Sequence, residues 1–442
     1  MLLKYLACNF KSIAHPVEFS MFPTEQGKDK GNLQIIKTRA GDWPILKRAG
    51  LFGPNASGKS SFIESIAFAK NYILTGSKIS KHIRIEQFKA ELLDIDYSCF
   101  EFLLYYKKEV YEYGFSIKDR NIRSEWLMML TDKGKYEGIF SRTSNENGTS
   151  IEVEGKFFNE NELNILNILK NTIAIKGRNQ LFINKIADSG ISIGEDIVDW
   201  FENIEIIFPN SKIRLLPIRI KSHAELGNML GSTLHELDTG VTNISLSEQV
   251  VAFEKFVDDL QIPEELASEI LQSSGSIVNI GRQCFLIGND EGGNNIKVIS
   301  INFNHQLFGN NYRIDFEDES DGTKRLVDLI PILYFAKHSE SIFIVDELDR
   351  SLHTKIATYF LAEFLKTTEG HNNQIIFSSH DLNLLNQEVL SQDEIWFVEK
   401  SYSGETKLRP FSDFEINANW NILLDYLNGR FGAIPNISER KI

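Results

Sequence analysis

Short apolar and aromatic segments dominate the first third of the chain and predict β-strands. They are Leu2 to Phe10, Val17 to Met21, Phe100 to Tyr105, Val110 to Ile117 and Asn121 to Leu130. β-Branched and aromatic residues favour strands, whereas the polar stretch from Thr24 to Asn32 predicts a loop. The first two segments predict a strand pair. The last three, with a polar turn at Lys107 and Lys108, predict an antiparallel meander.

The middle of the chain changes to apolar residues with helical spacing. Lys135 to Phe158 is rich in Gly, Asn, Ser, Glu and Lys, which predicts exposed hairpins. Helices are predicted for Asn161 to Ala187, for Glu195 to Glu202 and for Ser247 to Leu260, whose apolar residues share one face. We therefore expect a mainly helical insertion over residues 135–303, between an N-terminal lobe at 1–134 and a C-terminal lobe at 304–442. Such an insertion serves either internal packing or the binding of a partner.

Two apolar runs in the last third each end in polar residues. Ser341 to Val345 leads into Asp346 and Glu347, and Gln374 to Ser379 leads into His380. The segment between them is long enough for one helix, Ile356 to Lys366, so the two runs predict parallel strands that are buried on both faces. The chain is thus predicted to be an α/β protein. Ligands of open α/β sheets bind at the carboxyl ends of such strands.

The strongest local motif is the octapeptide Gly53-Pro54-Asn55-Ala56-Ser57-Gly58-Lys59-Ser60, which fits G-x-x-x-x-G-K-[ST]. It follows an apolar run and opens a helical stretch that begins at Ser61. In this context the backbone N–H groups of the loop close around a triphosphate, Lys59 reaches its outer phosphates and the Ser60 hydroxyl can bind Mg²⁺. The alternative is a chance match in a glycine-containing turn, but the flanking strand and helix favour ATP or GTP binding.

The polar residues after the two C-terminal strands fit the same chemistry. Asp346 is expected to hold Mg²⁺, directly or through a water, and Glu347 to polarise the water that attacks the γ-phosphate. His380 is expected to sense the γ-phosphate by donating a hydrogen bond. Without a phosphate loop, the two acids would be interpreted as a solvated pair and His380 as a structural or surface residue.

Residues Glu319 to Leu326 precede an apolar helix predicted from Val327 to Ala336. Ser320 and Gly322 stand at its N-terminus, where backbone N–H groups and the helix dipole form an anion site. Taken alone, this segment is a capped helix start. Together with the other motifs it resembles a signature sequence that completes the nucleotide site of an opposing subunit.

The length, composition and net charge of the chain restrict its size class, its cellular location and its binding partners. The chain has 442 residues, 42% of them apolar, which is enough for a large core or for two to three structural units. It has no apolar run of membrane-spanning length and no N-terminal signal pattern, so we expect a cytoplasmic protein. Cys8, Cys99 and Cys284 lack metal-site spacing and are interpreted as unpaired core thiols. The net charge of −14 argues against non-specific DNA binding through the overall field.

The combined motifs resemble ABC-type ATPases of the SMC and OLD-like branch, and within it the stand-alone prokaryotic ATPases, labelled AAA, of anti-phage systems. The ATPases of PARIS systems are the preferred match because they are similarly compact, and those of Septu systems come next. Further segments similar to this family are Asn9 to Ile13, Tyr111 to Phe115, Ser124 to Leu127 and Tyr426 to Pro435. The resemblance therefore covers nearly the whole chain.

The resemblance implies a role for each matching residue. The Walker A residues are Gly53, Asn55, Ala56, Ser57, Gly58, Lys59, Ser60 and Ser61, and the nucleotide-contacting residues also include Lys11, Ser320 and Gly322. The catalytic residues are Lys59, Glu347 and His380. Mg²⁺ would be held by Ser60 and Asp346, with Gln87 as a Mg²⁺-sensing residue; Gln87 could equally be a plain residue at a strand edge.

The resemblance also implies a function. ATP would act as a switch in a homo-oligomer with shared sites, and the partner would be a separately encoded effector, typically a nuclease, released or activated by a phage component. About sixty residues follow His380, too few for the metal-binding nuclease domain of OLD-type relatives, so we expect no nuclease activity in the chain itself. No sustained heptad pattern occurs between Asn161 and Asn302. The alternative function is a DNA-repair or structural-maintenance ATPase that contacts DNA directly.

Overall fold

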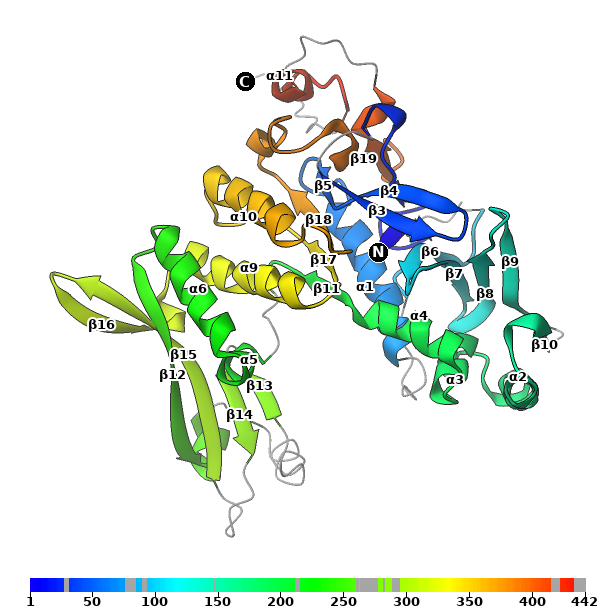
Figure 1. Ribbon diagram of the computed structural model, residues 1–442, viewed down its shortest axis with the longest axis horizontal. Coiled ribbons are helices and arrows are strands. Elements are labelled where there is room, and N and C mark those ends of the chain that lie inside the picture. The colour runs from blue at the N-terminus through cyan, green and yellow to red at the C-terminus, as the bar shows by residue number, and fades with distance from the viewer. Residues whose placement is uncertain are drawn as a thin grey trace. The chain divides into compact units, whose positions relative to one another are not determined.

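The chain folds into two compact units, and each consists of segments that are distant in the sequence (Figure 1). The computed structural model describes residues 1–27, 32–75, 85–89, 94–146, 148–210, 215–259, 262, 277–280, 283–287, 295–414 and 422–432. Unit 1 comprises Met1–Phe208, Ser339–Asp349 and Leu361–Ile442, and unit 2 comprises Pro209–His338 and Arg350–Phe360. These boundaries differ from those expected at 134/135 and 303/304, because residues 135–208 pack with the N-terminal strands.

Unit 1 contains a seven-stranded sheet in which all neighbouring strands are antiparallel. Its order is β10-β9-β8-β7-β6-β1-β2. The strands are β1 (Leu2–Cys8), β2 (Val17–Ser20), β6 (Ser98–Tyr106), β7 (Glu109–Lys118), β8 (Asn121–Leu130), β9 (Tyr136–Asn145) and β10 (Gly148–Val153). The predicted strand pair and meander are confirmed, and the polar segment from Lys135 forms the β9–β10 hairpin.

Two of the three cysteines face each other in this sheet. Cys8 at the end of β1 pairs with Cys99 at the start of β6, their Cα atoms are 5.1 Å apart, and a disulfide joins them. The expectation of unpaired core thiols is therefore wrong for this pair. The two residues are separated by 91 positions, so only the antiparallel register brings them within the distance that a disulfide requires.

A second sheet of unit 1 carries the strands that precede the sequence motifs. Its order is β11-β17-β18-β5-β19-β20, and every pair except β19 with β20 is parallel. The strands are β5 (Arg48–Phe52), β11 (Ile204–Ile207), β17 (Ile342–Val345), β18 (Gln374–Ser379), β19 (Ile395–Lys400) and β20 (Thr406–Pro410). Because β17, β18 and β5 are parallel neighbours, the segments that follow them meet at one edge, as the α/β prediction requires.

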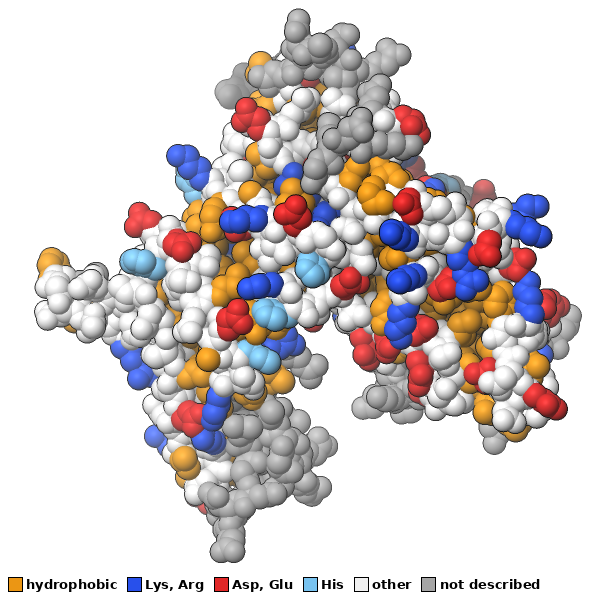
Figure 2. Space-filling view, viewed as in Figure 1, with side chains coloured by type: hydrophobic (Ala, Val, Ile, Leu, Met, Phe, Trp, Pro, Cys, Tyr) orange, Lys and Arg blue, Asp and Glu red, His pale blue; other side chains and the backbone are white. Residues whose placement is uncertain are grey.

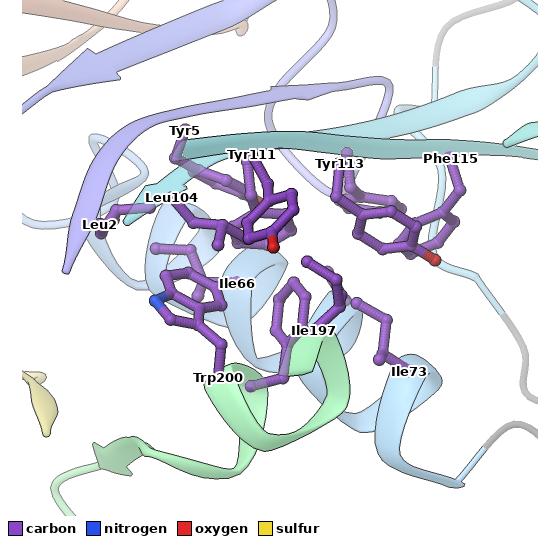
Figure 3. Packing of buried hydrophobic residues seen from close by; sticks show 14 of the residues in the cluster. Leu2, Tyr5, Ile66, Ile73, Leu104, Tyr111, Tyr113, Phe115, Ile197 and Trp200 are labelled. Carbon is purple, nitrogen blue, oxygen red and sulfur yellow. The ribbon is translucent and has the colours of Figure 1, made fainter. Parts of the chain in front are cut away.

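Helices α1 (Lys59–Thr75) and α4 (Ser192–Glu202) pack against one face of the antiparallel sheet. Figure 3 shows the rings of Tyr5, Tyr113 and Phe115 on the strands facing Ile66 of α1 and Ile197 of α4. From Leu3 to Ala7 the buried residues of β1 alternate with partly buried ones, as the alternation of a strand dictates. Burial raises the pKa of the Tyr5 phenol, whose hydroxyl donates to Ser65 Oγ over 2.8 Å.

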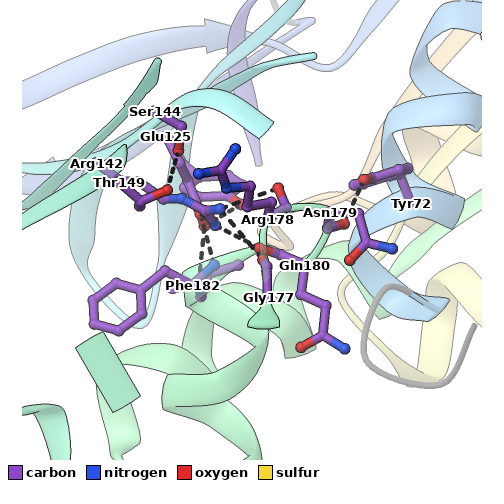
Figure 4. A network of polar contacts seen from close by, with 12 residues as sticks. Tyr72, Glu125, Arg142, Ser144, Thr149, Gly177, Arg178, Asn179, Gln180 and Phe182 are labelled. Carbon is purple, nitrogen blue, oxygen red and sulfur yellow. Dashed lines mark hydrogen bonds and ion pairs between the residues drawn. The ribbon is translucent and has the colours of Figure 1, made fainter. Parts of the chain in front are cut away.

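A buried polar network joins the meander to the following helices (Figure 4). Arg142 on β9 donates to the carbonyls of Arg178, at 3.1 Å, and of Gln180, in the connection between α2 (Glu160–Lys176) and α3 (Phe182–Asp188). Glu125 on β8 accepts from the N–H groups of Phe182 at 2.6 Å and Ile183 at 2.9 Å. The helix predicted from Asn161 to Ala187 is two helices. Glu125 satisfies the first N–H groups of α3, and Arg142 binds carbonyls of the segment that connects α2 to α3.

Unit 2 combines helices with a sheet of five strands. The sheet runs β12-β15-β14-β13, with β16 also paired to β15. Its elements are α5 (Leu216–Ser222), α6 (Ala224–Glu236), β12 (Val241–Ala252), α7 (Phe253–Asp259), β13 (Ile277–Ile280), β14 (Gln283–Ile287), β15 (Asn295–Leu307), β16 (Asn310–Asp315) and α9 (Asp321–His338). Leu230 of α6, Phe303 of β15 and Val327 of α9 share its apolar core.

The helix predicted from Ser247 to Leu260 is wrong over its first half, and the described part of the insertion contains strands as well as helices. Residues 247–252 belong to β12, which pairs with β15 along its whole length, and α7 begins only at Phe253. The apolar residues fit both periods over this short stretch, and the long-range pairing with β15 selects the strand. Leu260 lies outside the described residues.

The remaining described elements complete the two units. They are the hairpin β3 (Leu33–Thr38) and β4 (Gly41–Leu46), α10 (Thr354–Thr367) and α11 (Ile422–Leu427). In the described ranges, none of the helices has the length and hydropathy needed to cross a bilayer. Figure 2 shows acidic and basic side chains intermingled on the visible face.

Candidate functional site

The loop between β5 and α1 is folded around its own lysine. Lys59 is buried, and its Nζ donates to the carbonyl oxygens of Gly53 at 2.6 Å and Pro54 at 3.0 Å. Ala56 and Gly58 have positive φ angles of 62° and 110°, so the chain curls around the ammonium group. A lysine that is bound only to carbonyls of its own loop can transfer these bonds to phosphate oxygens.

The pKa of Lys59 is shifted by burial and by three nearby carboxylates. Burial lowers the pKa of its ammonium group to about 8, and the negative charges of Asp346, Asp349 and Glu347 oppose this shift. The residues that follow β17 therefore lie close enough to influence a residue that follows β5. An anionic ligand beside Lys59 would restore its pKa toward the ordinary value.

Two glycines of the loop stand where no side chain fits. A Cβ on Gly58 would lie 1.9 Å from Oγ1 of Thr406, and a Cβ on Gly53 would lie 2.1 Å from the carbonyl oxygen of Val398. Thr406 Oγ1 is also within 3.0 Å of the Ser57 carbonyl and 2.8 Å of Ser12 Oγ. Thr406 therefore supports the loop from β20. Sequence reasoning missed it because it belongs to no local motif.

The other predicted residues of the loop differ in exposure. Asn55, Ala56 and Ser60 are exposed, and Ser61 is partly buried. Ser57 is buried, and its hydroxyl has no hydrogen-bond partner in the described part of the chain. Buried polar groups are normally satisfied, so the loop offers an unused donor on its inner side.

The two acids after β17 are held by Ser378, the fifth residue of β18. Its hydroxyl donates to Oδ1 of the buried Asp346 over 2.5 Å and accepts from the N–H of Glu347 over 2.8 Å. Its carbonyl accepts from Leu348 over 2.9 Å. Glu347 has a left-handed backbone with φ 50°, which is unfavourable for a residue other than glycine and persists because these bonds hold the turn.

His380 follows β18 and is fixed through its backbone. Its N–H lies 3.2 and 3.3 Å from the two carboxylate oxygens of Asp349. Burial lowers the pKa of the imidazole, Lys59 adds to this effect, and the carboxylates of Asp349, Glu347 and Asp346 oppose it. The imidazole is therefore mainly neutral at pH 7 and can donate one hydrogen bond. The structure thus brings Lys59, Asp346, Glu347 and His380 together within unit 1.

Lys11 contacts Glu86, which precedes Gln87 in the chain, and Glu64 of α1. The backbone N–H of Lys11 donates to the Glu86 carbonyl over 2.7 Å, and its Nζ is 2.8 Å from Glu64 of α1 and 4.0 Å from Glu86. Gln87 is exposed. The ammonium of Lys11 is thus engaged with acids, and contact with a nucleotide would require it to exchange partners; both assigned roles stay predictions.

Ser320 and Gly322 belong to unit 2, at the start of α9. Ser320 Oγ accepts from the N–H of Thr323 over 3.1 Å, so Ser320 caps the helix. Gly322 lies against Ser351, whose carbonyl would be 2.9 Å from an added Cβ. Ser320 itself is exposed, so the helix start is accessible from solvent within this unit.

The side chains that could bind a metal at this site suit Mg²⁺ that is also bound to a nucleotide better than a metal bound by protein groups alone. Within the described ranges, no group of three or more His, Cys, Asp or Glu side chains could hold a metal. Mg²⁺ in phosphoryl-transfer sites is typically bound by one or two carboxylates together with substrate phosphates and water. Asp346 and the exposed hydroxyl of Ser60 fit that arrangement.

Comparison with known proteins gives a family and several distant structures. Residues 48–386 match the family model described as "AAA domain, putative AbiEii toxin, Type IV TA system". Comparison with curated proteins finds no match. Similar solved structures include an SMC head domain from Thermotoga maritima, with 13% identity, a TM-score of 0.37 and coverage of 94% of this chain and 99% of that chain.

Two other structures are similar to a comparable degree. One is an Smc head bound to the C-terminal winged-helix domain of ScpA (13% identity, TM-score 0.38, 92% of this chain and 96% of that chain). The other is an Smc head domain with an extended coiled coil, bound to the C-terminal domain of ScpA and derived from Pyrococcus furiosus (12%, 0.36, 92% and 95%). These identities and TM-scores are too low to assign a function.

Proposed function

Because the chain belongs to the family of AAA domains described as putative AbiEii toxins of type IV toxin–antitoxin systems, we propose that it binds ATP and hydrolyses it to ADP and phosphate. The observation that carries this proposal is the meeting of Lys59, Asp346, Glu347 and His380 at one edge of the parallel sheet. Phosphate loops placed before a helix bind triphosphates through backbone N–H groups.

Each residue has a distinct role in this proposal. Lys59 exchanges its bonds with the Gly53 and Pro54 carbonyls for bonds to the outer phosphates. Asp346 and Ser60 would hold Mg²⁺, which would supply positive charge to offset the negative charge of the phosphates. Glu347 accepts a proton from the attacking water, and the neutral imidazole of His380 donates to the terminal phosphate.

We further propose that two copies share each nucleotide. Ser320 and Gly322 of one copy would bind the terminal phosphate held by the Gly53–Ser60 loop of another, so ATP closes the assembly and hydrolysis opens it. The capped and exposed start of α9 supports this, since unpaired N–H groups at a helix N-terminus bind anions. Asp321 adds a negative charge to the same turn and limits the affinity of this site in a single copy.

The proposed biological role is the control of a separate effector in anti-phage defence. The resemblance to defence ATPases, together with the toxin–antitoxin wording of the family, supports a cytoplasmic switch that holds or activates a nuclease when a phage component is present. The nuclease activity would belong to the effector.

The decisive test compares Lys59→Ala and Glu347→Gln with the parent chain. The parent should release phosphate from ATP, Lys59→Ala should lose nucleotide binding, and Glu347→Gln should bind ATP, fail to hydrolyse it and sediment as a larger species. An ATP affinity of Lys59→Ala equal to that of the parent would contradict the proposed site, and an unchanged size of Glu347→Gln would contradict the shared arrangement.

A pull-down of tagged Glu347→Gln from its host tests the biological role. Recovery of a companion protein would support effector control, whereas recovery of DNA alone would favour the repair function.

A further inference from the structure

An acidic and aromatic pocket lies on the second face of the antiparallel sheet in unit 1. Its volume is about 380 Å³, and the residues that define it are Lys4, Glu18, Trp43, Glu101, Glu112 and Tyr136. Tyr5 packs against α1, and Lys4 and Leu6 alternate with it along β1 and point to the opposite face. This Trp43 pocket is therefore separated from the helices, and it contains none of the residues assigned to ATP.

The charges of the Trp43 pocket do not balance. Three glutamates oppose one lysine, which gives a formal charge of −2. Lys4 is paired with Glu18 at 3.0 Å, and Glu112 accepts from the indole N–H of Trp126 at 3.3 Å. Within the described ranges, the side-chain carboxylate of Glu101 accepts no hydrogen bond and forms no ion pair, although the charge of Lys4 acts on it. Burial raises the pKa of Glu101, the charges of Glu112 and Glu18 raise it further, and the charge of Lys4 opposes these effects in part. A cation placed here would offset the repulsion among the three carboxylates and favour the charged form of Glu101.

The aromatic rings that line the pocket favour a guanidinium group over an ammonium group. Trp43 and Tyr136 line it beside the carboxylates, and both rings are half-buried. A guanidinium group is planar, stacks on aromatic faces and pairs with a carboxylate through two N–H groups, whereas a lysine ammonium is a compact and strongly hydrated charge. The combination of rings and an unpaired carboxylate therefore fits arginine best.

The rim of the pocket indicates how such a group enters. The side chains of Lys4 and Glu18 are 43% and 55% exposed, so the pocket opens to solvent at an accessible sheet face. A side chain that projects from an extended segment of another protein can reach it without rearrangement of the strands. Arginine, tryptophan and tyrosine are also enriched where proteins bind one another.

We propose that the Trp43 pocket is a docking site for an arginine side chain in a basic segment of a partner protein. The charge complementarity of Glu101 and the aromatic walls carry this assignment, which does not depend on ATP hydrolysis. A bound arginine would pair with Glu101 and stack on Trp43, and the exposed Glu18 would attract neighbouring basic residues.

Fluorescence anisotropy with the full-length chain tests the proposal. The probe is a short fluorescein-labelled peptide of alternating arginine and serine, and the matched control replaces each arginine by citrulline, which has the same shape without the charge. The parent should bind the arginine peptide and not the citrulline peptide. Glu101→Gln should weaken binding about tenfold, as the loss of a charged hydrogen bond implies. Glu152→Gln removes an exposed charge on β10 and should leave binding unchanged.

Several results would overturn the proposal. Equal binding of both peptides, no binding by the parent, or the same affinity in Glu101→Gln and Glu152→Gln would each do so. If free argininamide displaced the labelled peptide at the same concentration as unlabelled peptide does, the pocket would be assigned to a small cation instead. A smaller sedimenting species for Glu101→Gln than for the parent would assign it to a second copy of this chain. Glu101→Gln removes a charge disfavoured by its neighbours, so thermal unfolding at or above the parent's midpoint verifies that the variant folds.

Discussion

The hydroxyl of Ser378 donates to Oδ1 of Asp346 over 2.5 Å. Ser378 Oγ also accepts a hydrogen bond from the backbone N–H of Glu347, so one side chain near the end of β18 fixes both acids that follow β17. The two strands are parallel neighbours, and this pair of bonds makes their ends a single rigid element. A displacement of the acids would therefore displace the segment that carries His380.

Ser378→Ala should lower kcat by about tenfold or more with little change in KM, because a buried carboxylate would lose a donor worth about 1–3 kcal/mol and Glu347 would lose its support. Steady-state ATP hydrolysis measures this. Ser379→Ala is the matched control: in the described part of the chain, the adjacent hydroxyl accepts only from the N–H of Asp381, at 2.9 Å, and its loss should change kcat much less. A rise in KM with unchanged kcat in Ser378→Ala would contradict the role in catalysis.

ATP affinity should fall as the pH rises above about 8. In the free protein the pKa of Lys59 is about 8, and phosphate oxygens beside it raise that pKa in the complex. Above pH 8 the complex therefore holds a proton that the free protein has lost, so binding takes up one proton and weakens by about tenfold per pH unit.

Binding of a fluorescent ATP analogue at pH 7, 8 and 9 measures this dependence. Lys59→Arg is the control, since a guanidinium keeps its proton throughout the range and should give no such dependence, whatever its affinity. The same slope in both proteins would assign the pH effect to another group.

Thr406→Val should weaken ATP binding by about fivefold to thirtyfold while leaving the protein folded. Valine has nearly the shape of threonine but cannot donate to the Ser57 carbonyl or bond Ser12, and such bonds contribute about 1–2 kcal/mol. Thr406→Ser retains the hydroxyl and should bind nearly as the parent does. Isothermal titration of ATP distinguishes the three proteins; equal affinity of the valine variant would show that β20 does not support the loop.

Arg142→Met should destabilise unit 1 by about 3–5 kcal/mol, because it leaves the Glu125 carboxylate buried without its cation (Figure 4). Burial raises the pKa of Glu125 and lowers that of Arg142, so each charge depends on the other. Thermal unfolding should show a lower midpoint, and adding Glu125→Gln should recover part of the loss. Lys156→Met breaks an exposed ion pair with Glu137 and should cost at most about 1 kcal/mol; a similar cost for Arg142→Met would contradict the network.

The sequence was most informative where a function is encoded in consecutive residues. The phosphate loop, the acids after β17 and the histidine after β18 were all placed correctly at strand ends, because a buried parallel strand has a recognisable apolar run and a polar terminus. It was least informative for Ser247 to Ala252. There the apolar spacing fits both a helix and a strand, and pairing with a distant strand decided between them.

The sequence by itself determined the local chemistry: a loop whose spacing fits the phosphate-binding motif, strands that end in acids, and a composition with an acidic excess. Only the tertiary structure decided which distant residues support that chemistry. Thr406 lies 349 positions from Ser57, and Cys8, Arg142 and Glu101 likewise acquire their partners or surroundings across strands. Sheet order and register set these contacts, and both depend on how the whole chain buries its apolar surface, which no short stretch of sequence specifies.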